Sequence, residues 1–301
     1  MKHVISCEQY TKEELEGVYE LADKIMKDPA KYSKELDGKI IATLFYEPST
    51  RTRLSFESAI QRVGAKLIST ENAKEVSSAV KGETLKDTLQ IIEGYAYAIV
   101  LRHSDNDSSE VAASIAKVPI INAGAGKAEH PTQALLDMYT IKSEKGKIDG
   151  LKICISGDLK YGRTTHSLVK LLSLYNNITV YGVSREFFKL PQKYIDYMKE
   201  RNVKYVPCLE FTDLPKDIDI IYHTRTQLER IEDKNVEIKE LIINKEVLDT
   251  FSKDTLIMHP LPRVNEICTD VDSDPRILFF KQAHNGIPIR MAVLLQVFNK
   301  K

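Results

Sequence analysis

The sequence has few cysteines, and none of them belongs to a Cys-x-x-Cys pair. The four cysteines of the 301-residue chain are widely separated, at Cys7, Cys154, Cys208 and Cys268. Structural zinc sites need closely spaced thiolate or imidazole ligands, and scattered cysteines are typical of a reduced compartment. We therefore expect no metal, no cofactor and a cytoplasmic protein.

The sequence also lacks an excess of charge and a long apolar run. Its 43 basic and 43 acidic residues cancel, and no long block of like charge stands out. This balance argues against nucleic acid or an anionic membrane as the main partner. No apolar run approaches the length of a membrane span, and the N-terminus lacks a signal-peptide pattern. A site for an anion must therefore be local and built from a few side chains.

What the chain does contain is a regular alternation of apolar and amphipathic segments. Helical spacing predicts a first helix over 11–27, and a last amphipathic stretch, 289–298, predicts a closing helix. Short apolar runs predict strands at 39–46, 65–69, 98–102, 118–122, 151–156, 177–183, 203–206, 218–223 and 255–258. Amphipathic runs predict helices between them at 53–63, 84–94, 108–117, 132–145, 164–175 and 191–201. This order predicts an α/β fold of two doubly wound parallel-sheet domains, with an active-site cleft between them.

The most informative stretch runs from Glu47 to Glu57, where the first predicted strand gives way to a helix. Ser49, Thr50, Arg51 and Thr52 stand at the start of that helix. Unpaired amides and the helix dipole favour an anion there, and hydroxyls and a guanidinium add donors that suit phosphate. The simpler alternative is a capped helix with surface arginines, because serine and threonine are common N-caps.

Further polar clusters also follow the ends of predicted strands, where ligands bind in open parallel sheets. They are Arg102-His103, His130 to Gln133, Gly157 to Thr164, Thr224 to Gln227 and His259 to Arg263. They contain arginines, hydroxyls and one well-placed histidine, His130, but no carboxylate pair for acid–base catalysis and no metal-ligand spacing. We therefore predict a metal-free transfer between two anionic substrates, with donors aimed at developing negative charge.

Several segments have simpler interpretations. His103, His166, His223 and His284 fit core or surface positions better than catalytic ones, and His259 precedes a proline and fits a turn. The polar segment 71–83 has weak periodicity and, from its residues alone, indicates an exposed loop. Residues 157–164 differ from a nucleotide-binding P-loop by an arginine in place of the lysine, so a nucleotide hydrolase is a distant alternative.

Taken together, the motifs resemble the aspartate/ornithine carbamoyltransferase superfamily nearly from end to end and in the same order. The Ser-Thr-Arg-Thr-Arg sequence at 49–53 marks the superfamily. The aspartate branch is indicated by His-Pro-Thr-Gln at 130–133, by residues 157–164, by Thr-Arg-x-Gln at 224–227 and by His-Pro-Leu-Pro-Arg at 259–263. The resemblance implies transfer of the carbamoyl group of carbamoyl phosphate to the amine of L-aspartate, an early step of pyrimidine synthesis.

The resemblance also implies roles for individual residues. The residues that would bind carbamoyl phosphate are Ser49, Thr50, Arg51, Thr52, Arg102, His130 and Gln133, with Thr52, Arg102 and His130 stabilising the oxyanion. The groups that would bind aspartate are the side chains of Arg163, Arg225 and Gln227 and the backbone of Leu261 and Pro262. Glu47 and Arg230 would help to close the domains over the substrates.

In this family a serine and a lysine from a neighbouring subunit complete the site, and Ser77 and Lys81 match them here. That match replaces the loop interpretation of 71–83 and implies a homotrimer, with regulatory chains as a further partner to consider. The closing helix is expected to return to the first domain. The expected domains are 1–133 with 286–301, for carbamoyl phosphate, and 134–285, for aspartate.

Two alternative functions are compatible with the fold that this resemblance implies. An ornithine carbamoyltransferase shares the phosphate half, but it usually carries a cysteine where this chain has Pro260. A non-catalytic scaffold of the same fold is expected to have lost a phosphate or oxyanion residue, and all of them are present.

Overall fold

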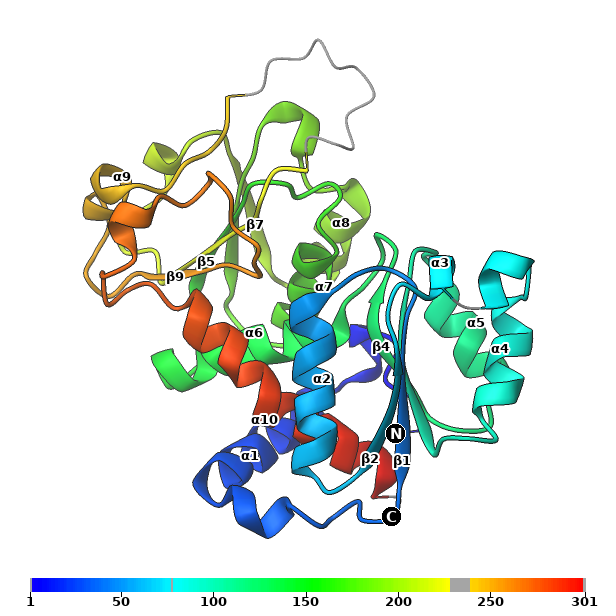
Figure 1. The fold of residues 1–301 in the computed structure, drawn as a ribbon. Coiled ribbons are helices and arrows are strands. Elements are labelled where there is room, and N and C mark those ends of the chain that lie inside the picture. The colour runs from blue at the N-terminus through cyan, green and yellow to red at the C-terminus, as the bar shows by residue number, and fades with distance from the viewer. Residues whose placement is uncertain (1, 77, 228–238, 300–301) are drawn as a thin grey trace. The chain divides into compact units, whose positions relative to one another are not determined.

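The computed structural model describes residues 2–76, 78–227 and 239–299 and consists of two compact units. The first unit contains Met1–Tyr139 and Asn285–Lys301, and the second contains Thr140–His284. Each unit has one parallel sheet with helices between its strands, so the predicted α/β fold class is confirmed (Figure 1). The expected boundary after residue 133 and the observed division after Tyr139 both lie within helix α6 (Pro131–Lys145).

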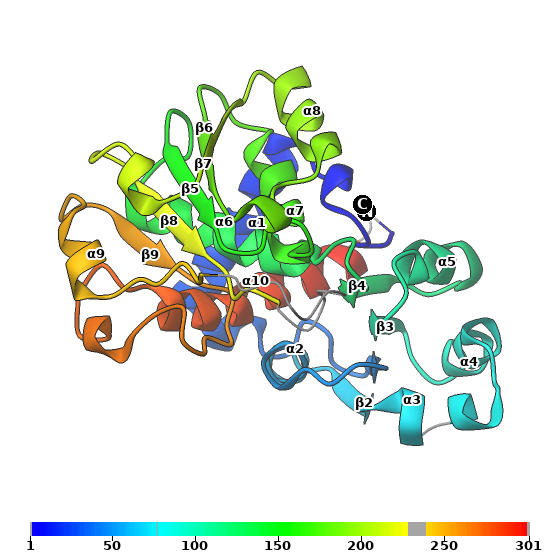
Figure 2. The same cartoon turned by 90° about the horizontal axis from the view of Figure 1, so that it is seen from above.

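The sheet of the first unit has four strands in the order β2-β1-β3-β4, all parallel. Helix α2 (Thr50–Arg62) lies on one face, and α4 (Leu85–Ile92) and α5 (Ser108–Ile115) lie on the other (Figures 1 and 2). Helix α1 (Lys12–Lys27) begins at a Thr11–Glu14 capping box, as its sequence predicts. The strands are β1 (Ile40–Phe45), β2 (Lys66–Thr70), β3 (Ala98–His103) and β4 (Ile120–Ala125).

Strand β1 shows how the sequence builds this layer. Its side chains alternate between the two faces of the sheet. Leu44 packs in a buried apolar cluster with Leu89 of α4, whereas the hydroxyl of Thr43 donates to Glu57 of α2 over 3.3 Å. A hydrogen bond therefore links the helix that carries the Ser-Thr-Arg-Thr motif to one face of the strand, while apolar packing covers the other face.

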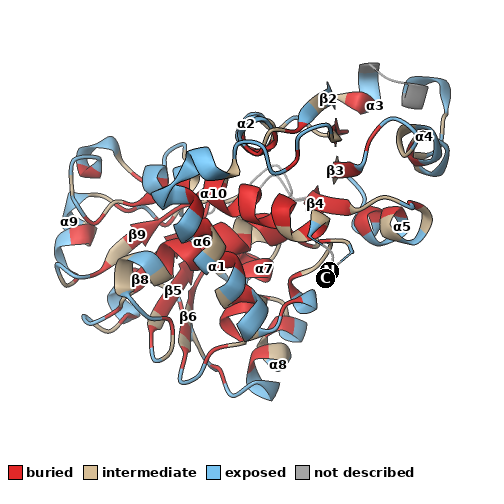
Figure 3. Cartoon of the chain, turned by 90° about the horizontal axis from the view of Figure 1, so that it is seen from below, coloured by how far each residue is buried: buried red, intermediate tan, exposed pale blue. Residues whose placement is uncertain are grey.

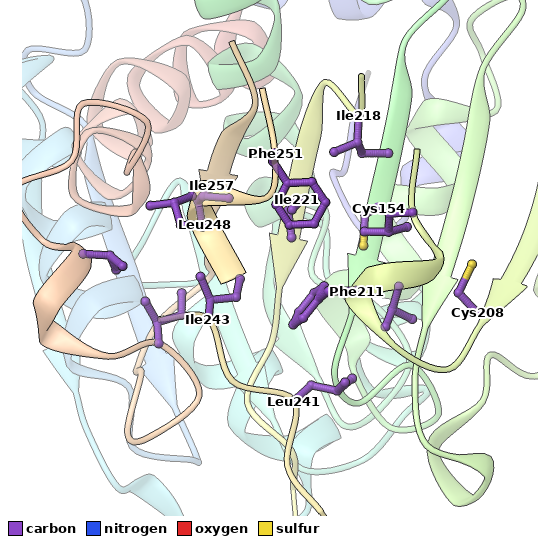
Figure 4. Close-up of a cluster of buried hydrophobic side chains, with 14 of the residues drawn as sticks. Cys154, Cys208, Phe211, Ile218, Ile221, Leu241, Ile243, Leu248, Phe251 and Ile257 are labelled. Atoms are coloured by element: carbon purple, nitrogen blue, oxygen red, sulfur yellow. The ribbon is translucent and has the colours of Figure 1, made fainter. Parts of the chain in front are cut away.

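The second unit has a five-stranded parallel sheet in the order β7-β6-β5-β8-β9. Its helices include α7 (Arg163–Leu172), α8 (Gln192–Glu200) and α9 (Lys245–Asp249). A cluster of buried side chains that includes Cys154, Phe211 and Ile257 covers one face of the sheet (Figure 4). The strands, which are largely buried in Figure 3, are β5 (Lys152–Ser156), β6 (Thr179–Val183), β7 (Lys204–Cys208), β8 (Ile220–His223) and β9 (Leu256–Met258).

Both strand orders contain a point where the chain reverses its direction of travel across the sheet. In the first unit this point lies between β1 and β3, and in the second it lies between β5 and β8. Ligands of doubly wound sheets bind outside the carboxyl ends of the strands at such a point. The motifs after β1, β3, β5 and β8 are therefore in the position that the fold favours for binding.

Two helical segments differ from the sequence-based prediction. The segment 71–83 is not a simple loop, because it contains α3 (Ala73–Val76) and a 3-10 helix, η3 (Ser78–Lys81). The closing helix α10 spans Phe279–Phe298 and begins ten residues before the predicted Ile289, with Pro288 inside it. Proline normally ends a helical pattern, so the sequence placed the start too late.

The remaining short helices are of the 3-10 type: η1 (Cys7–Gln9), η2 (Pro29–Tyr32), η4 (Glu186–Phe188), η5 (Phe211–Asp213) and η7 (Thr269–Val271). Within the described ranges, no helix combines the length and the apolar character that a membrane crossing requires.

Candidate functional site

The Ser-Thr-Arg-Thr motif forms the first turn of α2, directly after β1. Ser49 is the N-cap residue, but its side chain makes no capping hydrogen bond. Thr50 and Arg51 are exposed in the first turn, and Arg51 makes no ion pair with a described residue. The simpler interpretation, a serine-capped helix, therefore does not explain Ser49. A hydroxyl beside the amides of a helix start is well suited to an oxyanion.

Thr52, the last residue of the motif, faces inward and meets His130. The Thr52 hydroxyl oxygen lies 3.4 Å from Nε2 of His130, and both side chains are buried. His130 directly precedes α6 and follows β4. Two motifs that the sequence predicts at different strand ends are therefore brought together in the first unit.

Arg102 lies at the carboxyl end of β3, next to the end of β1. The register pairs Phe45 with Arg102, and the amide of Tyr46 donates to the Arg102 carbonyl over 2.9 Å. The Arg102 guanidinium contacts the carbonyl of Ala123 at 3.4 Å and the carboxylate of Glu47 at 3.6 Å. These contacts fix the arginine at the switch point, and the Glu47 contact is long enough to be exchanged for a ligand anion.

Gln133 lies in the first turn of α6 and is oriented by a buried carboxylate. Its side-chain amide donates to Asp137 over 2.9 Å, and Asp137 is fully buried. The buried Arg290 of α10 stacks 5.0 Å from the centre of the Phe56 ring. Burial lowers the pKa of Arg290 to about 10, and the charge of Asp137 opposes that shift. The sequence analysis missed both, although Gln133 and Asp137 have the i,i+4 spacing of a helical pair; Arg290 is distant in the chain.

Within the described residues, no contact joins the predicted intersubunit residue Lys81 to Thr52, Arg102 or His130. Lys81 is exposed at the end of η3 and has no ion pair with a described residue. Ser77 lies outside the described residues, and so does Arg230, the second residue predicted for domain closure.

In the second unit, Asp158 joins the loop after β5 to the loop after β8. Its carboxylate accepts the side-chain amide of Gln227 over 3.0 Å, and its backbone N–H donates to the Thr224 hydroxyl over 3.1 Å. Burial raises the pKa of Asp158, and hydrogen bonds from amides, including that of Tyr161, offset part of the rise. The sequence analysis assigned Gln227 to aspartate binding but missed Asp158 as the group that positions it.

Gly157 explains how closely these two loops can approach. Its backbone has φ of +100°, and a Cβ built there would lie 2.1 Å from the Thr224 carbonyl oxygen. Only glycine can adopt this conformation so close to the backbone of Thr224. The first glycine of the P-loop-like motif therefore serves the packing of two strand ends.

The same loop differs from a nucleotide-binding P-loop in how its amides are used. The backbone amides of Lys160 and Tyr161 donate to the Asp158 carboxylate over 3.1 and 2.8 Å. A P-loop presents such amides to phosphate oxygens. Here a carboxylate of the protein already occupies them, which argues against the nucleotide-hydrolase alternative.

The two arginines predicted to bind aspartate lie in the segments that follow β5 and β8. Arg163 is the first residue of α7, after β5, and Arg225 follows β8 by two residues. Both side chains are half-buried, so their guanidinium groups are partly shielded from water. The spacing from β5 and β8 places both arginines at the carboxyl edge of the sheet, where two carboxylates require two guanidinium groups.

The His-Pro-Leu-Pro-Arg motif follows β9, the next strand of the same sheet. The buried His259 accepts the amide of Leu261 over 2.8 Å, which confirms that it shapes a turn. Leu261 is half-buried and Pro262 is exposed, so their backbone groups are accessible. Arg263 is held by both carboxylate oxygens of Asp272.

The chemistry of both clusters is that of anion binding and of hydrogen-bond donation. Guanidinium, hydroxyl and imidazole groups follow the strand ends of the first unit, and guanidinium and amide groups follow those of the second. The part of the chain that the structure describes has no group of three or more His, Cys, Asp or Glu side chains that could hold a metal ion. Such sites can bind two anionic substrates and stabilise an oxyanion.

Comparison with known proteins also divides the chain into two domains, although the second matched domain includes most of α10, which the structure places in the first unit. The carbamoyl-P binding domain of the aspartate/ornithine carbamoyltransferases matches residues 2–143, and their Asp/Orn binding domain matches residues 149–297. The aspartate carbamoyltransferase catalytic subunit of Methanocaldococcus jannaschii is 48% identical over 299 residues, covering 98% of this chain and 97% of that protein. The chloroplastic aspartate carbamoyltransferase of Arabidopsis thaliana is 45% identical over 302 residues, covering 98% of this chain and 77% of that protein.

Solved structures show the same similarity. The catalytic subunit of M. jannaschii aspartate transcarbamoylase has a TM-score of 0.91 at 48% identity, covering 99% of this chain and 98% of that one. The Trypanosoma cruzi aspartate transcarbamoylase in complex with carbamoyl phosphate and aspartate has a TM-score of 0.91 at 36% identity, covering 98% and 96%. The chain therefore belongs to the aspartate/ornithine carbamoyltransferase family and is a carbamoyltransferase.

Proposed function

We propose that the chain transfers the carbamoyl group of carbamoyl phosphate to the amine of L-aspartate, giving N-carbamoyl-L-aspartate and phosphate. The observation that carries this proposal is the contact of Thr52 with His130 in the first unit, at a helix start that suits phosphate and with Arg102 at the end of the strand between β1 and β4. The similarity to aspartate carbamoyltransferases favours aspartate over ornithine as the acceptor.

The first unit is the proposed carbamoyl-phosphate domain. Ser49, Thr50, Arg51 and the first-turn amides of α2 bind the phosphate, because hydroxyls, amides and a guanidinium match its oxygens. Thr52, Arg102 and His130 donate to the carbonyl oxygen. Gln133, oriented by Asp137, binds the carbamoyl amide.

The second unit is the proposed aspartate domain. Arg163 and Arg225 bind the two carboxylates, and Gln227, held by Asp158, contributes a further polar contact. Backbone groups of Leu261 and Pro262 contact the carbamoyl amine and aspartate. An acidic amino acid suits these two guanidinium groups, whereas the cationic side chain of ornithine would be repelled by them.

The chemistry needs no nucleophile from the protein. The neutral amine of aspartate attacks the carbonyl carbon, a C–N bond forms, and the carbonyl oxygen becomes an oxyanion. Collapse of this intermediate breaks the C–O bond to phosphate, and the amine passes a proton to the departing phosphate. Donors aimed at the oxyanion and the binding of both substrates supply the rate, so we expect no cofactor.

This assignment is tested by measuring how one substitution affects the binding of each substrate separately. We expect Arg225→Gln to raise the KM for aspartate by at least about tenfold, because one charge-assisted carboxylate contact is lost. Its equilibrium affinity for carbamoyl phosphate, measured by calorimetry, should equal that of the wild type. The matched control is Arg201→Gln, since Arg201 is an exposed arginine of the same unit that stacks on Tyr197. An unchanged aspartate KM in Arg225→Gln would contradict the assignment.

We further propose a homotrimer in which Ser77 and Lys81 complete the carbamoyl-phosphate site of a neighbouring subunit. The exposed position of Lys81 and the exposed apolar residues nearby in sequence, Val80, Ile91 and Tyr95, support an interface on this segment. Two inactive variants, Lys81→Ala and Arg102→Ala, should recover about a quarter of wild-type activity when dissociated and reassembled together. No recovery would contradict a shared site.

The remaining assignments are predictions of the same proposal. Glu47 and Arg230 help to close the domains over the substrates. Regulatory chains, if they bind, would add mass beyond that of a trimer in sedimentation of the complex from its native source. A cytoplasmic location rests on the scattered cysteines, which are all free in the structure.

A further inference from the structure

We propose that His259 is a positioning residue for aspartate binding: its ring holds the backbone at Leu261 in the conformation that meets the substrate. This inference rests on the proposed function, in which backbone groups of Leu261 and Pro262 contact aspartate. It adds a residue that the sequence analysis assigned only to a turn.

The two ring nitrogens of His259 have different and well-defined partners. Nδ1 accepts the backbone N–H of Leu261 over 2.8 Å, and Nε2 lies 2.9 Å from Oε1 of Glu266. A backbone N–H can only donate, so Nδ1 carries no proton in this contact. The proton of the neutral ring therefore lies on Nε2 and is donated to the Glu266 carboxylate.

Glu266 is itself fixed, and it fixes the ring in turn. The side chain is 4% exposed, and its second oxygen accepts the amides of Val264 and Asn265 over 3.0 and 3.1 Å. Burial would raise the pKa of Glu266, but hydrogen bonds from His259 and from backbone amides lower it to about 2. The carboxylate is therefore charged and bridges both ends of the loop 259–266.

A third contact holds His259 from α10. The backbone N–H of His259 donates to the side-chain oxygen of Gln282 over 2.9 Å. The ring is 1% exposed, so it cannot rotate into solvent. Its orientation is set by groups on both sides of the loop.

The conformation that this ring supports is an unusual one. Leu261 has φ of +56°, in the left-handed region, which is unfavourable for a residue other than glycine. Such strain persists only where the surroundings fix it, and it concentrates at functional sites. Here the strained backbone is partly open to ligands, since Leu261 is half-buried and Pro262 is exposed.

The two ring contacts can be separated by two amide substitutions of similar polarity. In His259→Asn the side-chain oxygen can take the place of Nδ1 and accept the Leu261 N–H, while the Glu266 contact is lost. In His259→Gln the longer side chain can donate to Glu266, but the Leu261 N–H loses its acceptor. A positioning role through Leu261 requires the two variants to differ in their KM for aspartate.

The experiment measures the KM for aspartate, the calorimetric affinity for carbamoyl phosphate, and Tm for the wild type and both variants. We expect His259→Gln to raise the aspartate KM about tenfold, the effect of losing one well-placed hydrogen bond. His259→Asn should raise it less than about threefold. The affinity for carbamoyl phosphate should change less than the aspartate KM in both variants, because its phosphate binds the other unit and only its amine meets the backbone at Leu261 and Pro262.

Equal aspartate KM values in the two variants, or a lower Tm with an unchanged KM, would overturn the inference and leave His259 a packing residue. If either variant does not fold, Glu266→Gln replaces it. The glutamine amide then faces either the donors of Val264 and Asn265 or the donor of His259, so the aspartate KM should again rise. A wild-type aspartate KM in Glu266→Gln would overturn the inference.

Failure of the proposed function gives a different result. A wild-type protein that forms no carbamoyl-aspartate overturns the proposed function and this inference with it. An active wild type whose variants do not separate overturns this inference alone.

Discussion

The hydroxyl oxygen of Thr52 lies 3.4 Å from Nε2 of His130, although 78 residues separate them in the sequence. Thr52 belongs to the helix after β1, and His130 follows β4. Strand β3, which carries Arg102, lies between these two strands in the sheet. The three donors that we propose for the oxyanion thus come from the ends of three adjacent strands, an arrangement that would suit carbamoyl transfer.

We predict that His130→Ala and Arg102→Ala each reduce kcat by about a hundredfold or more, the scale of removing one oxyanion donor. Steady-state assays at saturating carbamoyl phosphate and aspartate would measure this. His284→Gln is the matched control for the histidine, because His284 is exposed on α10, and it should keep wild-type turnover. Full activity in either alanine variant would exclude that residue from oxyanion stabilisation.

Gly157→Ala should be far more damaging than Gly146→Ala, although both glycines have positive φ. A Cβ at Gly157 would lie 2.1 Å from the Thr224 carbonyl oxygen, whereas one at Gly146 meets nothing within 4 Å. We expect Gly146→Ala to cost about 1 kcal/mol of unfolding free energy and Gly157→Ala at least about 3 kcal/mol. Urea unfolding of both variants compares them directly. Equal losses would show that the β5 and β8 loops are free to separate.

The stability of the fold should decrease between pH 7 and pH 5 because of His223. This buried ring accepts from Ser156 and donates to the Leu241 carbonyl, and burial lowers its pKa from 6.5 to about 4. Below pH 6.5 the unfolded chain binds this proton and the folded chain does not. The contribution of the neutral His223 ring to the free energy of unfolding is therefore complete above pH 6.5 and is lost as the pH falls toward 4. The expected loss at pH 5 is about 2 kcal/mol.

Urea midpoints at pH 7 and pH 5 test this for the wild type and for His223→Asn. The variant is less stable at pH 7, but it should lose about 2 kcal/mol less than the wild type on acidification. If both proteins lose the same amount, another group causes the pH dependence.

The strands β1 to β9 of the described residues were predictable because most of them are short apolar runs, and parallel pairing followed from the helices between them. The residues that we propose for binding were chosen from the same pattern, since polar motifs after parallel strands share one edge of a sheet. The partners that orient them were not predicted. Asp158 supports Gln227 through a contact between residues distant in the chain, which the sequence does not show. Asp137 and Glu266 lie four and seven residues from Gln133 and His259, and the helical i,i+4 spacing of Gln133 and Asp137 was a signal that the sequence analysis overlooked.

Helix α10 shows a second limit of prediction from the sequence, which concerns the start of a helix. Local sequence rules ended the helical pattern at Pro288, but the observed helix continues through it. A proline loses only one backbone hydrogen bond, and packing of apolar residues on both sides can outweigh that loss. Tertiary burial decided the boundary, and no local signal reports it.

The most direct test of the account is product formation from carbamoyl phosphate without added metal, with aspartate and ornithine supplied in separate reactions. We predict carbamoyl-aspartate and phosphate in equal amounts with aspartate, and no citrulline with ornithine. Citrulline in the ornithine reaction would contradict the roles of Arg163 and Arg225 and leave only the phosphate half of the account. No product in either reaction would contradict catalysis itself and favour a non-catalytic scaffold.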